Sequence, residues 1–195
     1  MTDESLLRYD EGALSERVAA LTGPERVLLA AACAERLMPL YEWIAGAAAV
    51  SEVGRVRSAL DLAWSASASA QQVERAQAEV EELVPDEEDE DRTADVALVQ
   101  NSIIAVAYTL RAKGSSDTQE VIWAARQLYE AADYIVQREA PNQTYIENLE
   151  QEAPIQLVLR GLDSALGDLE GASLTQLRAR AQADGNALLV LFKAE

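Results

Sequence analysis

Hydrophobic residues recur every three to four positions along most of this chain, the spacing that places them on one face of an α-helix. No stretch alternates apolar and polar residues strictly enough to predict several strands. The pattern therefore predicts an all-α protein: a single compact bundle of about seven to eight helices, forming one domain over residues 1–195. The expected helical segments are 14–21, 24–45, 53–64, 73–83, 93–113, 117–135, 143–169 and 173–183.

Three prolines and one glycine set the expected helix boundaries. Pro24 fits the first turn of a helix, where its missing N–H leaves no hydrogen bond unmade. Pro39 lies inside the second segment and removes one backbone hydrogen bond, so we expect a kink or a break there. We expect Pro154 to interrupt the seventh segment and Gly185 to end the eighth. The apolar tail 187–192 is expected to dock onto the bundle, because a free tail would expose a hydrophobic patch.

Composition supports the helical interpretation and adds a strong charge. Hydrophobic residues make up 49% of the chain and aromatic residues only 5%, and the abundance of Ala and Leu favours helices. The 34 acidic and 16 basic residues leave a net charge of −18. Half of this net charge lies in residues 74–95, around six consecutive carboxylates that follow Pro85. Such a field repels itself unless water, cations or a basic partner screens it.

The absence of histidine and the presence of a single cysteine exclude several classes of active site. Ser-His and Cys-His nucleophilic pairs need a histidine base, and zinc sites need more Cys or His ligands than this chain supplies. No glycine-rich phosphate-binding loop is present. Cys33 lies within an apolar run, which is typical of a small buried hydrophobic residue.

The charge also limits the expected location and partners. Acidic polar faces argue against binding to nucleic acid or to anionic lipid. The chain has no stretch of about 18 apolar residues to span a membrane, and residues 1–4 lack the basic region of a signal peptide. We therefore expect a cytoplasmic protein with no nucleic-acid or membrane partner.

The acidic run has two interpretations. It is either a solvated inter-helix turn at 85–92 or a docking surface for a basic protein. Complementary charge raises association rates and excludes acidic competitors, and an array of carboxylates imitates a phosphate backbone, as an inhibitor of a nuclease would. The residues expected to contact such a partner are Asp86, Glu87, Glu88, Asp89, Glu90 and Asp91.

A divalent-metal-dependent hydrolase is the alternative from another class. Glu130 and Asp133 are three residues apart on a predicted helix, so both can face the same way. Together with Glu87 or Glu90 they would resemble the acidic motifs with which helical pyrophosphatases hold Mg²⁺ through oxygen ligands. The competing interpretation leaves Glu130 solvated and gives Asp133 a structural role.

Other conspicuous residues are given structural roles. Arg36 is expected to form an internal salt bridge, and Asp133 is expected to pair with Arg36 or Arg126. Three tryptophans are candidates for lining a ligand pocket, but at helical positions they are more typical of the core. These are Trp43, Trp64 and Trp123.

Five phrases in order resemble a known family. Residues 33–41 read Cys-Ala-Glu-Arg-Leu-Met-Pro-Leu-Tyr, which is similar to the Cys-x-Glu-Arg-Leu-x-Pro-x-Tyr pattern of the YjaG-like bacterial family of unknown function, domain of unknown function 416. Segments 59–64, 85–86, 131–137 and 178–185 resemble later parts of the same family, so the phrases span nearly the whole chain.

The resemblance implies an all-helical single domain and no particular reaction. This sequence departs from the family in having no histidine, a different apolar tail and a longer acidic turn. We therefore expect a diverged relative whose function has changed.

Taken together, the sequence predicts a non-enzymatic acidic protein-interaction module without a cofactor. In its sharpest form, it is an immunity or inhibitor protein that neutralises a basic toxin or nuclease by binding. The alternatives are the metal-dependent hydrolase and a housekeeping structural protein whose charge only aids solubility. Alanine-rich faces and the apolar residues 188–192 also suggest a homodimer.

Overall fold

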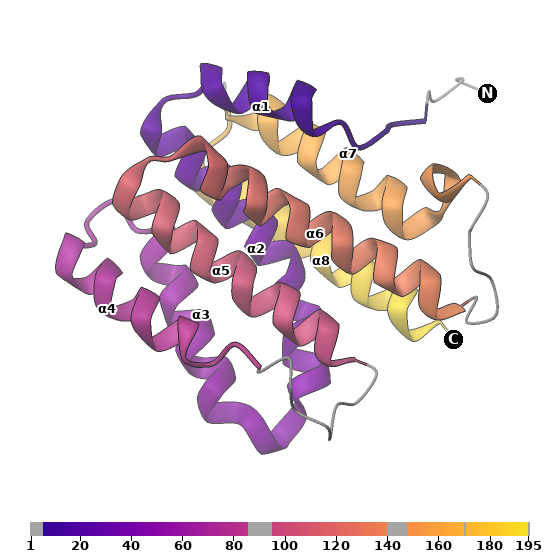
Figure 1. Ribbon diagram of the computed structural model, residues 1–195, viewed down its shortest axis with the longest axis horizontal. Coiled ribbons are helices and arrows are strands. Elements are labelled where there is room, and N and C mark those ends of the chain that lie inside the picture. Colours follow the sequence, from indigo (N-terminus) through magenta and orange to yellow (C-terminus); the bar gives the residue numbers. More distant parts are fainter. Residues whose placement is uncertain (1–5, 86–94, 140–147, 170, 195) are drawn as a thin grey trace.

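The computed structural model describes residues 6–85, 95–139, 148–169 and 171–194, and these residues form an all-α bundle, as expected (Figure 1). Two short 3₁₀ helices, Gly46–Ala49 and Leu149–Gln151, lie between α-helices, and the described residues include no strand. The α-helices are α1 (Glu11–Ala20), α2 (Gly23–Ala45), α3 (Val50–Trp64), α4 (Ala70–Glu81), α5 (Val96–Ser115), α6 (Thr118–Glu139), α7 (Ala153–Asp168) and α8 (Leu174–Lys193).

The helices form two layers. Helices α4, α5, α6 and α7 pack side by side in that order, and α3, α2 and α8 form the layer behind them (Figure 1). Helix α2 packs against α3, α5, α6, α7 and α8, while α1 lies across α6. Buried residues from all eight helices belong to a single hydrophobic cluster. Among the described residues, no helix is long and apolar enough to cross a membrane.

Helix α2 is the centre of the bundle. Every side chain from residue 29 to residue 38 is buried, so this part of the helix faces protein on all sides. Most of these residues are Ala, Leu or Cys, whose small or unbranched side chains favour a helix and let neighbouring helices approach closely. The same stretch also contains the charged pair Glu35 and Arg36.

The start of α2 agrees with the sequence, and the helix is not broken at Pro39. Thr22 caps the helix together with Glu25 in a capping box, and Pro24 lies in the first turn. Helix α2 continues through Pro39 to Ala45 without the expected break. Leu40 lies beyond the proline and is completely buried, and this packing offsets a cost of about 3 kcal/mol for a proline inside a helix.

Pro154 begins a helix instead of interrupting one. It lies in the first turn of α7, where its missing N–H has no intrahelical partner to lose. The described part of the expected segment 143–169 is therefore a 3₁₀ turn followed by α7. The expected interruption near Pro154 is therefore present at Glu152, which separates the 3₁₀ turn from α7, and the proline itself belongs to the helix that follows.

Gly185 lies inside α8, so the prediction that it ends the last helix was also wrong. A Cβ atom added to Gly185 would lie 2.6 Å from the backbone oxygen of Arg36. The glycine therefore allows α8 to lie directly against α2, and the helix runs on to Lys193. Leu188 and Phe192 are buried, which confirms that the apolar tail docks onto the bundle.

Replacing Gly185 by alanine should lower the free energy of unfolding by about 1–3 kcal/mol, since the new methyl group would press against backbone that cannot rotate away. This would occur although alanine favours a helix over glycine by about 1 kcal/mol. Gly54→Ala in α3 is the control: nothing lies within 4 Å of the added Cβ, so we expect a gain of up to about 1 kcal/mol. Urea unfolding measures both, and a Gly185→Ala protein as stable as the parent would refute the close contact.

Candidate functional site

The six acidic residues expected to contact a partner, residues 86–91, lie outside the described residues, so their role stays a prediction. The helix before them continues the acidic surface. Glu74 and Glu82 are exposed, on α4 and just after it. Glu81 pairs with Arg111 of α5, which leaves one carboxylate of this region neutralised. The described part of residues 74–95 therefore presents negative charge to solvent.

The residues proposed to hold a metal ion are only partly described. Glu87 and Glu90 lie outside the described residues. Glu130 is exposed and accepts a hydrogen bond from Nε2 of Gln127 at 3.1 Å. In the described part of the chain, no group of three or more His, Cys, Asp or Glu side chains is placed to hold a metal ion. Glu130 and Asp133 on α6 therefore have no third metal-binding side chain beside them among the described residues.

Asp133 does not pair with either of the arginines expected from the sequence. It accepts a hydrogen bond from Nε2 of Gln137 at 2.7 Å, one turn along the same helix. Arg126 instead pairs with Glu11 of α1, and Arg36 pairs with an aspartate of α8. The partners are far apart in the sequence, so the helical spacing around Asp133 did not reveal them.

Glu35 is the centre of a buried polar cluster. Its side chain is completely buried, and both of its oxygens accept hydrogen bonds. Oε1 accepts from Arg57 of α3 and from Nε2 of Gln182 at 3.1 Å. Oε2 accepts from Nε1 of Trp64 at 2.9 Å and from Nε of Arg178 at 3.0 Å. Two cations and two neutral donors therefore compensate one buried negative charge.

Arg36 forms the internal salt bridge that the sequence predicted, and its partner is Asp184. The guanidinium is 2% exposed, and Nη2 lies 2.8 Å from Oδ2 of Asp184. It also donates to the backbone oxygens of Ala32 at 2.9 Å and of Gly161 at 2.8 Å. A Cβ atom on Gly161 would lie 2.7 Å from Nε of Arg36, so this glycine makes room for the guanidinium.

A shallow pocket lies beside the polar cluster, where α3 ends and α8 begins. Arg178 lines it, but the guanidinium is already paired with Glu35 and with Asp61. Its charge is therefore neutralised within the protein, and the pocket has no free cation with which to grip a phosphate or carboxylate ligand. The remaining lining residues are Trp64, Ser65, Leu174, Thr175, Ala179 and Gln182.

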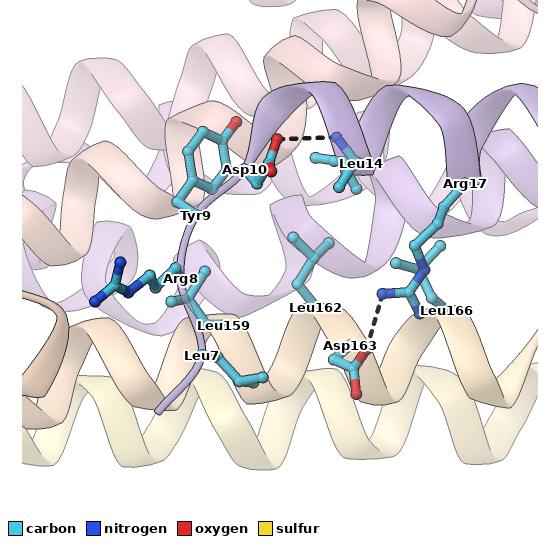
Figure 2. A pocket seen from close by; sticks show the side chains of 11 residues that line it. Leu7, Arg8, Tyr9, Asp10, Leu14, Arg17, Leu159, Leu162, Asp163 and Leu166 are labelled. Atoms are coloured by element: carbon cyan, nitrogen blue, oxygen red, sulfur yellow. Dashed lines mark hydrogen bonds and ion pairs between the residues drawn. The ribbon is translucent and has the colours of Figure 1, made fainter. Parts of the chain in front are cut away.

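A second pocket lies beneath the N-terminal segment, between α1 and α7 (Figure 2). Leucines of α7 form much of its lining, and an ion pair between Arg17 and Asp163 at 2.8 Å joins the two helices beside it. Its volume of about 110 Å³ is well below the roughly 300 Å³ of the smallest typical ligand sites. It is a packing defect under a covering segment rather than a substrate cavity.

Gln156 fixes the N-terminal segment over this pocket. The N–H of Leu7 donates to Oε1 of Gln156 at 3.2 Å, and Nε2 of Gln156 donates to the oxygen of Leu7 at 2.8 Å. Tyr9 stacks on Tyr129 of α6, with ring centroids 4.5 Å apart. A single side-chain amide thus binds the backbone as a neighbouring strand would, a role that the sequence analysis did not foresee.

Cys33 is not an activated nucleophile. Cys33 is completely buried, and burial raises the pKa of its thiol to about 11, while the charge of Arg36 lowers it only in part. The thiol therefore stays protonated near neutral pH. The expectation that Cys33 is a small buried hydrophobic residue is confirmed.

The tryptophans differ from one another. Trp64 is buried and donates to Glu35, as expected for a core residue. Trp43 is 48% exposed and packs edge-to-face against Phe192 at the end of α8, so its assignment to the core was wrong. Trp123 is partly buried beside Tyr108. Trp64 lines the shallow pocket beside the polar cluster, which has a volume of about 440 Å³.

Comparison with known proteins finds a family and a related structure. The model of a family described as "Protein of unknown function (DUF416)" matches residues 13–156, well over half of the chain. A crystal structure of a DUF416 family protein from Shewanella baltica OS155 is similar, with a TM-score of 0.67 and 15% sequence identity over 89% of this chain and 93% of that chain. At this identity the similarity shows the fold alone. No curated protein matches the sequence.

Glu35→Gln should lower the free energy of unfolding by about 3–5 kcal/mol, because it leaves two partly buried arginines without their shared carboxylate. The amide would also turn donors toward donors. Glu42→Gln is a matched control, since Glu42 pairs with the same Arg57 but is 41% exposed, and such a pair contributes less than about 1 kcal/mol. Urea unfolding compares the two variants, and equal costs would contradict the central role of Glu35.

The thiol of Cys33 should not react with an aromatic disulfide reagent in the native protein at pH 8, because it is buried and its pKa is raised to about 11. In urea the exposed thiol should react within minutes. Absorbance of the released chromophore measures both rates. Rapid reaction of the native protein would show that α2 opens to solvent.

Proposed function

The chain belongs to the DUF416 family of proteins of unknown function, and we propose that it acts by binding a basic protein rather than by catalysis. In the sharpest form of this proposal, it is an immunity or inhibitor protein that neutralises a basic toxin or nuclease. The family membership agrees with the resemblance seen in the sequence. It carries no activity, so the proposal depends on the distribution of charge.

The observation that carries the proposal is that most of the basic side chains are engaged with other groups of the same chain. Arg26 donates to the carbonyls of Val18 and Ala19, and Lys113 to those of Ala63 and Ser65. Within the part of the chain that the structure describes, eight arginines pair with carboxylates: Arg17, Arg36, Arg57, Arg75, Arg111, Arg126, Arg178 and Arg180.

This arrangement leaves the excess of acids uncompensated. The chain has 34 acidic and 16 basic residues, so neutralising the bases internally leaves a negative field on the outside. Charges at the surface steer a partner of opposite sign and can raise the association rate by a factor of about 10–1,000. A basic protein surface is the partner that this field favours, whereas nucleic acid and anionic lipid are repelled.

The proposed contact surface is the run 86–91 together with the exposed acids of α4. The run follows Pro85 and comes shortly after Glu82 in the sequence. Helices α4 and α5 pack against each other and hold both ends of this connection. A concentrated field on a rigid support gives a high on-rate and a defined orientation to the partner.

Two features of the described residues favour binding over catalysis. The most buried carboxylate, Glu35, already accepts four hydrogen bonds and has no free lone pair directed at a cavity. The thiol of Cys33 is protonated and enclosed. Groups with these environments hold a fold together and do not exchange protons with a substrate.

The proposal is tested with a panel of purified basic nuclease toxin domains, measuring inhibition of DNA and RNA cleavage and the association rate. We expect stoichiometric inhibition of at least one domain, with an association rate that falls as salt rises. Polylysine serves as the control for non-specific attraction. Absence of inhibition across the panel, with binding no tighter than to polylysine, would contradict the inhibitor function.

A matched pair of charge variants tests the location of the surface. Glu87→Gln, Glu88→Gln and Glu90→Gln together should slow association about tenfold at low salt, because the steering field is reduced where the partner docks. The control carries Glu16→Gln, Glu52→Gln and Glu130→Gln, three exposed glutamates on α1, α3 and α6, and should change the rate less than about threefold. Equal slowing of both variants would refute the assignment to the run.

A further inference from the structure

The C-terminal part of α8 borders an open apolar groove. Val190 is 65% exposed and Leu6 is 50% exposed, and both lie at the edge of this groove between α7, α8 and the N-terminal segment. Helices α7 and α8 pack side by side there (Figure 1). The other lining residues are Gln151, Ala153, Gln156, Leu157, Arg160, Ala187 and Leu191. Of the apolar residues 188–192 that suggested a dimer from the sequence, Leu188 and Phe192 are buried in the bundle, whereas Val190 is exposed.

Helix α8 differs from the rest of the surface in charge. Asp184 is the only acidic residue between positions 174 and 193, and it is paired with Arg36. Arg178 and Arg180 on the same helix are paired with acids of α2, α3 and α7. Lys193 at the end of α8 lies over the ring of Trp43, so α8 presents no unpaired carboxylate, although the whole chain carries −18.

This charge pattern selects the partner. A basic protein is attracted to the acidic surface and has nothing to pair with on α8. Nucleic acid is repelled by a chain whose net charge is −18. Two copies of this chain repel each other strongly when their acidic surfaces face one another. The repulsion is weakest when they approach through α8. The surface has both an apolar groove and apolar side chains that protrude at its edge. In a symmetric pair of chains, the protruding side chains of each copy can therefore fit into the groove of the other.

We propose that α8 and the adjoining groove form the interface of a two-fold symmetric homodimer. In such an interface the same patch meets itself, so Val190 and Leu6 of each copy fill the groove of the other. A 20-residue helix is about 30 Å long, and with the neighbouring helix about 10 Å away it offers about 600 Å² per copy. This area is at the lower limit for a specific protein–protein interface, so we expect a dimer of moderate affinity.

The salt dependence of the dimer should be opposite in sign to that of the basic partner. Two copies that each carry −18 repel one another over the whole molecule, and salt screens that repulsion. Raising sodium chloride from 50 to about 500 mM should therefore strengthen the dimer. The dimer does not depend on the proposed inhibitor function, because it uses a different surface.

Sedimentation equilibrium of Val190→Glu and Val50→Glu tests the interface. Val50 is 67% exposed at the start of α3, so the two variants introduce the same charge at equally exposed positions. We expect the parent and Val50→Glu to dimerise in the micromolar range at high salt, and Val190→Glu to lose at least about tenfold in affinity. Thermal unfolding should be equal in both variants, since neither side chain is buried.

Crosslinking provides a second measurement of the same surface. Cys33 is completely buried, so an introduced thiol is the only reactive one. Val190→Cys should give a covalent dimer with a short bis-maleimide at high salt, whereas Val50→Cys should not. A parent protein that stays monomeric at 1 mM in about 500 mM salt, or a Val190→Glu variant that dimerises as tightly as the parent, would overturn the proposal.

Discussion

The structure depends on a pair of adjacent, oppositely charged side chains that are buried in the middle of α2 and cannot neutralise each other. Consecutive residues of a helix point about 100° apart, so Glu35 and Arg36 face different neighbours. Glu35 is compensated by α3 and α8, and Arg36 by α7 and α8. Leaving either charge unpaired costs several kcal/mol. The packing of three helices on α2 is therefore coupled through two adjacent residues.

Close approach of the helices is the other half of this constraint. Gly161 of α7 leaves space for the guanidinium of Arg36, and Gly185 of α8 lies against the backbone of the same residue. Neither contact tolerates a side chain without movement of neighbouring atoms. The charges specify which helices meet, and the glycines specify how near they come. Because the basic groups are used in this way inside the fold, the acids dominate the outside and shape both proposed interactions.

Much of the fold could be predicted because its cause is local. The three-to-four spacing of apolar residues identified α1 to α6, and their buried faces are the predicted ones, as with Leu14 and Val18 in α1 or Val73 and Val80 in α4. The buried polar cluster around Glu35 and Arg36 was harder to predict from the sequence. A glutamate and an arginine within an apolar run indicate that partners must exist. Asp184 lies 148 positions from Arg36, however, and no local spacing identifies it.

The sequence alone determined the helical class and the excess of negative charge, because residue preference, periodicity and net charge need no information about distant contacts. Tertiary structure alone decided what the helix breakers do. Pro39 and Gly185 stay inside helices because burial beyond the proline and contact at the glycine outweigh their local preference. The local preference of proline or glycine against a helix is worth about 1–3 kcal/mol, which is less than the free energy gained by packing a whole helix. Only the assembled bundle therefore shows whether the local preference or the packing prevails.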